Sequence, residues 1–522
     1  MQLKIVILKA ALTAALLATV SPLAAQGISA LQTMPSDARA VTVRGIGDGQ
    51  ADDSAAIQQA IDATADQGGG GIVFLPAGEY RITRTIFLWP GVRLLGTGAT
   101  RPRIVLGDAT PGFQQGLANM IVFAGARRSG EGGRSEGGRP GTRQAPPFPV
   151  HGSVPFDPAI ADAHPGSFYS GISNIDIRVG EGNPATAAIR FHAAQHAFVT
   201  HMDFDLGSAF AGLYQVGNIG QALHFRGGRY GIVTEKPSPA WPFALIDATF
   251  EGQRDAAIRE HEAGLTMVNV AIRDTPVGVE IDEGYGDWLF GKDLRFENVS
   301  RAAVIISNEN TAYTQVSFEN ALAANTPTFA HFRDSGKTVA GSGDAYSVAR
   351  FNYGLAVPGF DRMGSFATVM EASPIAALPP RGSAAIRALP ATGEWYNVRD
   401  GGAKGDDRTD DTAAIQRAID THRVVYFPAG RYIVTDTLRL RPDSVLVALH
   451  PSLTQIILPD GTAAFQGVGA PKALIQTAAG GDAIVSGLGL FTGGINPRAT
   501  ALLWMAGAES LVDDVKFQGG HG

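Results

Sequence analysis

The sequence predicts an all-β fold, a right-handed parallel β-helix solenoid in two tandem copies, each with a short N-terminal capping helix. Two observations predict it. Short apolar segments recur at intervals of 19 to 26 residues through the middle of the chain, and a block near the N-terminus returns near the C-terminus. A repeat of roughly 20–25 residues that holds several short strands suits one turn of a parallel β-helix.

The repeated block occupies residues 47–82 and again 405–433. Both copies contain Asp-Asp-x-x-Ala-Ile-x-x-Ala-Ile, followed by Pro-Ala-Gly-x-Tyr. The first pattern is displaced by 358 residues and the second by 352, which is one six-residue deletion. A match of this length with a single deletion indicates two related domains.

Each copy predicts a short helix followed by strands. The aspartate pairs at 52–53 and 410–411 are expected N-cap residues, whose side-chain oxygens would accept hydrogen bonds from amides of the first helical turn. Four apolar residues then fall on one helical face in the first copy: Ala56, Ile57, Ala60 and Ile61. We therefore expect each helix to cover an apolar surface.

The 522 residues, 45% of them hydrophobic, are enough for two sizeable domains. The chain has no cysteine, so its stability has to come from burial and from backbone hydrogen bonds. The net charge of -7 argues against nucleic acid as the main partner but is compatible with an anionic polysaccharide. A monomer with a polysaccharide or oligosaccharide substrate is expected.

Residues 1–25 resemble a secretory signal. Lys4 and Lys9 supply the positive start, and an apolar segment spans 10–20. Leu23-Ala24-Ala25 offers a cleavage site. The apolar segment is too short to span a bilayer, which predicts a secreted or periplasmic protein without a membrane span.

The predicted first β-helix domain covers residues 41–372, with a flexible insertion at 127–152 that is rich in Arg, Gly, Ser and Glu. A proline-rich linker at 373–393 leads to a second β-helix domain at 394–522. The second copy follows the first to its last residue and lacks a counterpart of about 160 further residues. It is therefore predicted to be incomplete, as a fragment of a longer protein or as an unusually short second helix.

Six apolar segments define the periodic region, and further strand-like pieces lie between them. Asn174, Asn269 and Asn298 recur in similar turn contexts, as an asparagine-lined turn would allow. The segments begin at Ala188, Gly212, Gly231, Ala257, Gly278 and Ala303.

The densest group of polar residues lies at 259–262 and 280–288. If one turn separates the two stretches, their strands lie about 4.8 Å apart. Arg259 would then lie beside Glu280 and His261 beside Asp282. The alternative is a neutralising salt-bridge ladder on the outer face. The candidate catalytic residues are Glu260, Glu262, Glu280 and Asp282, and the candidate substrate-binding residues are Arg259, His261, Glu235, Tyr285, Asp287 and Trp288.

These residue types suit carbohydrate chemistry. Glycoside hydrolysis needs two carboxyl groups, about 5 Å apart for retention or about 6.5–9.5 Å apart for inversion. Tyr285 and Trp288 offer flat apolar faces for sugar rings. No cofactor and no metal are predicted, because the aspartate pairs are helix-start residues and no calcium-loop spacing occurs.

The two repeated blocks resemble the N-terminal segment of pectate-lyase superfamily β-helix proteins. Two such blocks in one exported chain look most like glycoside hydrolase family 55, whose members are exo-acting β-1,3-glucanases built from two side-by-side β-helices. The resemblance implies inverting hydrolysis with a glutamate acid from the second helix, which falls outside this sequence. Where family members have Gln-rich and Trp-rich segments, this chain has 259–262 and 280–288.

Three functions follow from the residues and the resemblance. The first is an exported glycoside hydrolase that cleaves a β-1,3-glucan-like polysaccharide by carboxylate acid/base catalysis. The second is a polysaccharide lyase or epimerase on uronates, with Arg259 or a histidine as base or charge neutraliser. The third is a non-catalytic, glycan-binding β-helix.

Overall fold

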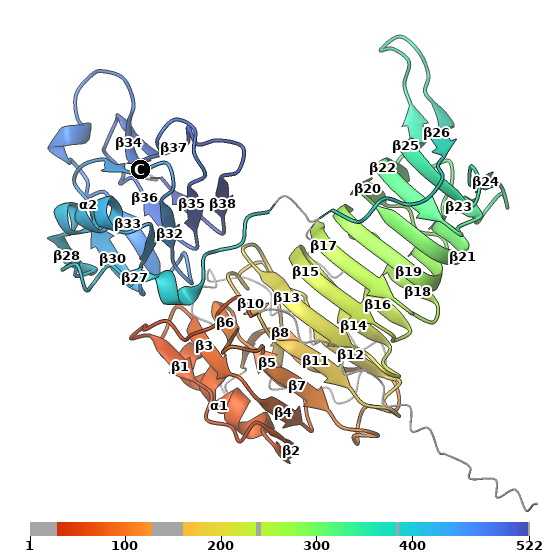
Figure 1. Cartoon of the computed structure of the whole chain (residues 1–522), viewed down its shortest axis with the longest axis horizontal. Coiled ribbons are helices and arrows are strands. Elements are labelled where there is room, and N and C mark those ends of the chain that lie inside the picture. The colour runs from red at the N-terminus through yellow and green to blue at the C-terminus, as the bar shows by residue number, and fades with distance from the viewer. Residues whose placement is uncertain (1–28, 128–159, 236–241, 383–385, 520–522) are drawn as a thin grey trace, which may run out of the picture.

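The protein is a parallel β-solenoid of about 17 turns with few helices, as the sequence predicts (Figure 1). The computed structural model describes residues 29–127, 160–235, 242–382 and 386–519. The predicted export signal at 1–25 lies outside the described residues, as does the predicted insertion apart from Arg127. Within the described part of the chain, every helix is too short or too polar to traverse a lipid bilayer.

The first solenoid is one continuous sheet of 26 strands wound around a single core. Its strands are β1 (Ala40–Thr42), β2 (Asp48–Asp52), β3 (Gly71–Pro76), β4 (Glu79–Ile82), β5 (Ile86–Leu88), β6 (Val92–Thr97), β7 (Arg103–Leu106), β8 (Ala118–Arg127), β9 (Ile160–Asp162), β10 (Gly171–Ser173), β11 (Asp176–Val179), β12 (Thr186–Arg190), β13 (Phe198–Asp205), β14 (Ala211–Tyr214), β15 (Asn218–Arg226), β16 (Tyr230–Val233), β17 (Phe243–Glu251), β18 (Ala256–Glu260), β19 (Leu265–Ile281), β20 (Trp288–Lys292), β21 (Arg295–Ile306), β22 (Gln315–Ala324), β23 (Thr328–Phe332), β24 (Thr338–Ala340), β25 (Ala345–Ala356) and β26 (Ser365–Pro374).

The register of successive turns confirms the periodicity read from the sequence. One aliphatic residue per turn pairs with its counterpart on the next turn, and all six are buried in the core. Their spacings of 24, 19, 26, 21 and 25 residues are those of the predicted segments. The row is Ile189, Leu213, Ile232, Ile258, Val279 and Val304.

A second row of the core is aromatic. The rings of Phe204 and Phe225 stack with centroids 4.7 Å apart, and those of Phe225 and Phe250 with centroids 4.8 Å apart. Their spacing equals the distance between adjacent strands, so each turn adds one ring to the stack.

Asparagine-lined turns are present as predicted. Asn174, Asn269 and Asn298 adopt φ values of 61°, 53° and 54°, in the left-handed region that asparagine tolerates. The Asn269 and Asn298 side chains donate to Asp247 and Asp274 of the preceding turn. These residues bend the chain between strand stacks.

Two helices occupy the positions predicted for them, α1 (Ser54–Ala65) and α2 (Thr412–Thr421). Asp53 and Asp411 occupy the N-cap position as predicted but make no side-chain cap bond, and the aspartate before each of them accepts from the first helical amide instead. Asp52 accepts a hydrogen bond from the Ser54 amide, whereas the Asp53 carboxylate makes no cap bond and instead accepts from the Ile46 and Gly47 amides. Its backbone is turned away from the extended conformation typical of an N-cap, so its side chain faces the preceding loop.

Residues after the 26-stranded sheet form α2 and three separate parallel sheets with a core of their own. Their strands are β27 (Tyr396–Asn397), β28 (Asp406–Asp410), β29 (Val424–Tyr426), β30 (Gly430–Ile433), β31 (Leu438–Arg439), β32 (Val445–Val447), β33 (Thr454–Ile457), β34 (Lys472–Gln476), β35 (Ile484–Ser486), β36 (Gly489–Phe491), β37 (Ala499–Leu503), β38 (Leu511–Asp513) and β39 (Lys516–Gln518).

This C-terminal part lies beside the N-terminal end of the first solenoid (Figure 1). The connecting segment runs back along the first solenoid, and Arg381 in it donates to Thr249 and to main-chain oxygens of the turns that it crosses. At the far end, β25 pairs antiparallel with β22, and β26 extends it as a projecting hairpin. β23 still pairs parallel with β21, and β24 pairs antiparallel with β23, so the parallel winding ends with β22 and β23.

Candidate functional site

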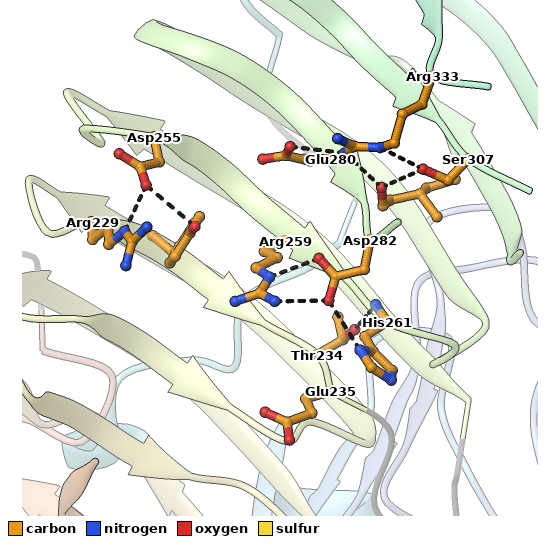
Figure 2. A network of polar contacts seen from close by, with 12 residues as sticks. Arg229, Thr234, Glu235, Asp255, Arg259, His261, Glu280, Asp282, Ser307 and Arg333 are labelled. Carbon is orange, nitrogen blue, oxygen red and sulfur yellow. Dashed lines mark hydrogen bonds and ion pairs between the residues drawn. The ribbon is translucent and has the colours of Figure 1, made fainter. Parts of the chain in front are cut away.

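The candidate site lies on the outer face of the turns built from β16, β18 and the C-terminal part of β19 (Figure 2). Val233, Arg259 and Glu280 are register partners on these three strands. They point outward because their neighbours Ile232, Ile258 and Val279 belong to the inward row. The predicted placement of Arg259 beside Glu280 is confirmed.

The ion pairs differ from the predicted ladder. The Arg259 guanidinium binds both carboxylate oxygens of Asp282, at 2.7 and 3.0 Å, rather than Glu280. Glu280 accepts from Arg333 at 2.9 Å (Figure 2). The planar guanidinium group favours the carboxylate to which it can donate two parallel hydrogen bonds. Arg333 follows β23 and could not be assigned to this site from the periodic segments.

Asp282 also holds His261, with Oδ2 at 3.0 Å from Nδ1. Burial by itself would raise the pKa of the Asp282 carboxyl, but the hydrogen bonds from His261 and Arg259 outweigh burial and lower this pKa. The carboxyl is therefore ionised and only accepts, so Nδ1 carries a hydrogen. In the neutral imidazole, Nε2 is then left as a proton acceptor.

Tyr285 lies against His261, with ring centroids 3.7 Å apart, and is exposed at the edge of the site. The hydrogen bond to Asp282 fixes the plane of the imidazole, and the tyrosine ring restricts it from one side. Together they orient one titratable group toward the outer face. This is the arrangement that a general base needs.

Glu260 points into the protein and is fully buried. Its Oε1 accepts from the Ala263 amide at 2.8 Å, and Asp287 lies beside it. Burial raises the pKa of Glu260 well above its usual range, and the neighbouring Asp287 carboxyl raises it further. A side chain without solvent exposure does not contact a polysaccharide, so Glu260 supports the turn beneath His261 instead.

Asp287 is also buried and organises two loops. Its Oδ1 accepts from the Gly264 amide at 3.0 Å and from the Trp288 amide at 2.7 Å. Like Glu260, it lies below the outer face.

The two remaining glutamates lie in turns. Glu235 follows β16, and its Oε2 accepts from the Tyr214 hydroxyl at 2.6 Å. Burial, together with Glu235, raises the pKa of that hydroxyl. Glu262 is half-buried after β18, with a φ of 55°. Figure 2 shows Glu235 on the same outer face as Arg259 and Asp282.

Trp288 begins β20 and is 62% exposed. Its ring lies near that of Tyr313, with centroids 6.2 Å apart and planes inclined by 12°. Tyr313, like Tyr214 and Arg333, was not among the residues singled out from the sequence. The sequence periodicity could have placed Tyr214 on this face, since it occupies the same position in its segment as Arg259 does. Tyr313 lies in a loop and had none.

A second trio matches Arg259, His261 and Asp282 in chemistry. Arg190 binds both oxygens of Asp162, and His192 Nδ1 lies 3.3 Å from the same carboxylate. All three are buried, and Asp162 reaches the other two from β9, which pairs antiparallel with β8. Among the described residues, no three His, Asp or Glu side chains converge as metal ligands would.

Parts of this chain are similar in sequence to known proteins. Two segments, residues 39–132 and 395–484, match the family described as rhamnogalacturonase A/epimerase, pectate lyase-like. They contain α1 and α2 with the strands around them. The candidate site at 235–288 lies outside both matching segments.

Curated relatives match short stretches only. Mannuronan C5-epimerase AlgE3 of Azotobacter vinelandii is 41% identical over 98 residues, which is 17% of this chain and 5% of the relative. A probable glucan endo-1,3-beta-glucosidase of Arthroderma benhamiae is 42% identical over 50 residues, 9% of this chain and 6% of the relative. The chain thus matches a small part of the length of either protein.

Among solved structures, the catalytic unit of the GH87 alpha-1,3-glucanase from Streptomyces thermodiastaticus strain HF3-3 is similar to this chain. The match covers 95% of this chain and 70% of the glucanase chain. The sequence identity is 12% and the TM-score is 0.33.

Proposed function

We propose that this protein is a carbohydrate-active enzyme that removes the C5 proton of a uronate residue in a polysaccharide. One observation carries the proposal, the contact of Asp282 with His261 Nδ1, which leaves Nε2 as a base beside the Arg259 guanidinium. The C5 proton of a uronate is adjacent to the carboxylate carbon. Its removal therefore needs a base on one side and a cation that stabilises the charge developing on the carboxylate.

The steps balance with the residues at hand. Arg259 uses Nε and Nη2 for Asp282, and no described residue accepts from its Nη1, which would bind the uronate carboxylate. His261 Nε2 takes the C5 proton, and the electron pair delocalises into the carboxylate. A water molecule on the opposite face gives a proton to C5, which yields the epimer, and the hydroxide that remains takes the proton from His261 Nε2.

Elimination is the other outcome of the same intermediate. The C4–O bond breaks, a C4=C5 double bond forms, and the leaving oxygen takes a proton from the Tyr285 hydroxyl. Both reactions begin with the same transfer to His261. The site residues on this chain thus supply base, cation and acid within one exposed patch.

The comparisons support this substrate class without deciding it. The AlgE3 relative is named as an epimerase of mannuronan, and the matching family description also names an epimerase. A predicted export signal at 1–25 would bring the protein to extracellular or periplasmic polymers. The division into domains at 41–372 and 394–522 is part of the proposal as well.

Glycoside hydrolysis is the second candidate, and one observation favours it. Glu235 and Asp282 present carboxyl groups on one outer face from different turns (Figure 2), as an acid and base pair would require. The match to a glucan endo-1,3-beta-glucosidase agrees with a β-1,3-glucan substrate. It ranks second because Glu260 is buried, while Glu280 and Asp282 are held by arginines. Binding without turnover is the third candidate.

Product analysis separates the three. The protein is incubated in deuterium oxide with mannuronan, polygalacturonate and a β-1,3-glucan, and the products are followed by mass and ultraviolet absorbance. Deuterium at C5 of the epimer, unsaturated products from elimination, or both are the expected result. Shortened saturated sugars without C5 deuterium would replace the proposal with hydrolysis. The absence of any product would leave a binding protein.

A further inference from the structure

An exposed aromatic pair lies next to the candidate site, at the first residue of β20 and in the loop that precedes β22. Trp288 and Tyr313 are 62% and 66% exposed, and their rings are nearly parallel. Large aromatic side chains gain free energy by burial, so two of them held together at the surface indicate a contact surface for a ligand.

The loops are built to hold this pair in place. The Asp287 carboxylate accepts from the Trp288 amide, and the Asp287 carbonyl accepts from the Gln315 amide at 2.9 Å. A side chain at Gly286 would meet the Thr314 hydroxyl at 2.6 Å, so glycine lets the two loops approach each other. The ring positions are thus fixed by hydrogen bonds and close packing rather than by contact between the rings alone.

The pair is continuous with the candidate site. Tyr285, which lies against His261, is three residues before Trp288 on the same loop. Trp288 and Gln315 are register partners on adjacent strands, so Tyr313 lies one turn further along the solenoid. The order of surface groups is His261, Tyr285, Trp288 and Tyr313.

We propose that Trp288 and Tyr313 form a remote subsite that binds sugar rings of the same polysaccharide chain beyond the reacting residue. A pyranose presents one face of C–H groups, which complements the negative face of an aromatic ring. A ligand that extends from His261 past Tyr285 meets these two rings next. The subsite therefore favours long oligosaccharides over short ones, and this deepens the proposed function, on which the choice of uronate probes rests.

The test measures affinity against chain length. Size-graded oligomannuronates and oligogalacturonates of two to eight residues, and β-1,3-gluco-oligosaccharides of the same lengths, are titrated calorimetrically into the full chain carrying His261→Ala, which prevents turnover under the proposed function. Trp288→Ala and Tyr313→Ala are added singly to this background. Each is expected to lower the affinity for the longest oligomers about tenfold, the usual effect of truncating an aromatic anchor, and to leave the affinity for dimers within about twofold.

Matched variants keep the result interpretable. Phe360→Ala removes a fully exposed aromatic ring on the distant hairpin and is expected to change nothing. Gly286→Ala leaves both rings present but pushes the loops apart, so it should reduce the preference for long oligomers as the ring truncations do. Equal losses for dimers and octamers in folded variants, or no loss in either, would overturn the subsite.

The two proposals can fail separately. Length-dependent binding to Trp288 and Tyr313 without C5 chemistry would retain the subsite and reject the proposed reaction. C5 chemistry that depends on His261, with affinity independent of the two rings, would retain the reaction and reject the subsite.

Discussion

Arg93 and Asp514 are 421 residues apart in the sequence and form a two-point ion pair, with nitrogen–oxygen distances of 2.5 and 3.1 Å. The arginine lies on β6 and is 2% exposed, and it also donates to the main-chain oxygens of Leu449 and Tyr169. His450 Nε2 lies 2.9 Å from the Gly91 carbonyl in the same interface. The C-terminal sheets are thus attached to the start of the first solenoid by buried polar contacts.

Asp514→Asn is expected to loosen this attachment. Asparagine keeps the size of the side chain and tolerates the φ of 49° at this position, but it leaves the Arg93 charge buried without its partner. The loss of one partner of a buried pair costs about 3 kcal/mol. Amide hydrogen exchange should speed up across residues 396–518 and stay unchanged in 186–306.

Glu371→Gln is the matched control for that prediction. Glu371 pairs with Arg350 on the projecting hairpin, where both side chains are about half exposed. Removing an exposed pair costs at most about 1 kcal/mol. Similar exchange rates in both variants would argue that Arg93 does not attach the C-terminal sheets.

His261→Ala is expected to lower kcat on a uronate polymer about 10²- to 10⁴-fold, the range of general base catalysis. Asp282→Asn should also lower it, because the amide releases Arg259 and no longer selects the Nδ1–H tautomer. The measurement is the initial rate of C5 deuterium incorporation. His331→Ala changes a histidine on the same outer face three turns further on, and should keep the full rate.

Glu260→Gln is expected to remove part of the pH dependence of stability. The folded-state pKa of Glu260 is raised, mainly by burial and then by Asp287. Between the ordinary glutamate pKa of about 4.3 and this raised pKa, the folded state binds more protons than the unfolded state. The contribution to the free energy of unfolding is therefore complete below the lower pKa and is lost as the pH rises through the higher one.

Urea midpoints at several pH values between 5 and 9 check this sign. The glutamine amide can accept from Ala263 and donate to Asp287 without ever ionising, so the midpoint of the variant should fall less toward high pH. Asp287→Asn should also flatten the profile, by removing the neighbouring charge. An unchanged slope in both variants would contradict a protonated Glu260.

Phe225→Ala is expected to destabilise the first solenoid by about 3–5 kcal/mol, because it leaves a cavity in the middle of the aromatic stack. Phe225→Leu fills most of that space and should cost less. Urea unfolding of both variants measures the difference. A loss as small for alanine as for leucine would mean that the stack can collapse around the gap.

The sequence was sufficient to predict the solenoid because every turn repeats the same pattern of inward apolar residues. Each turn needs one inward aliphatic residue in register with the last, and the row from Ile189 to Val304 shows that spacing directly. It was harder to predict which aspartate binds the amide of the first helical turn, since Asp52 and Asp53 are adjacent residues of the same type. Which of them caps the helix depends on where the preceding loop passes, and that loop contains no periodic signal.

The candidate site could be predicted only in part, as two stretches of sequence show. Ile189-Arg190-Phe191-His192 and Ile258-Arg259-Glu260-His261 share one pattern, and in both an aspartate binds the arginine and lies beside the histidine. One trio is buried and the other is open. The two trios differ in the origin of the aspartate: Asp162 comes from β9, 28 residues before Arg190, whereas Asp282 lies one turn after Arg259. Local pattern gave no sign of that difference.

The hairpin of β25 and β26 has a consequence for how these molecules behave at high concentration. A parallel coil that ends on an open strand offers a template to the first coil of another molecule, and stacking of that kind leads to fibres. Here the last two strands of the winding, β22 and β23, are paired in the reverse direction by β25 and β24, and β26 carries Glu371 and ends in Pro374. The described residues thus offer no parallel edge on β22 or β23 to a coil of another molecule, and the hairpin acts as a terminator of the winding.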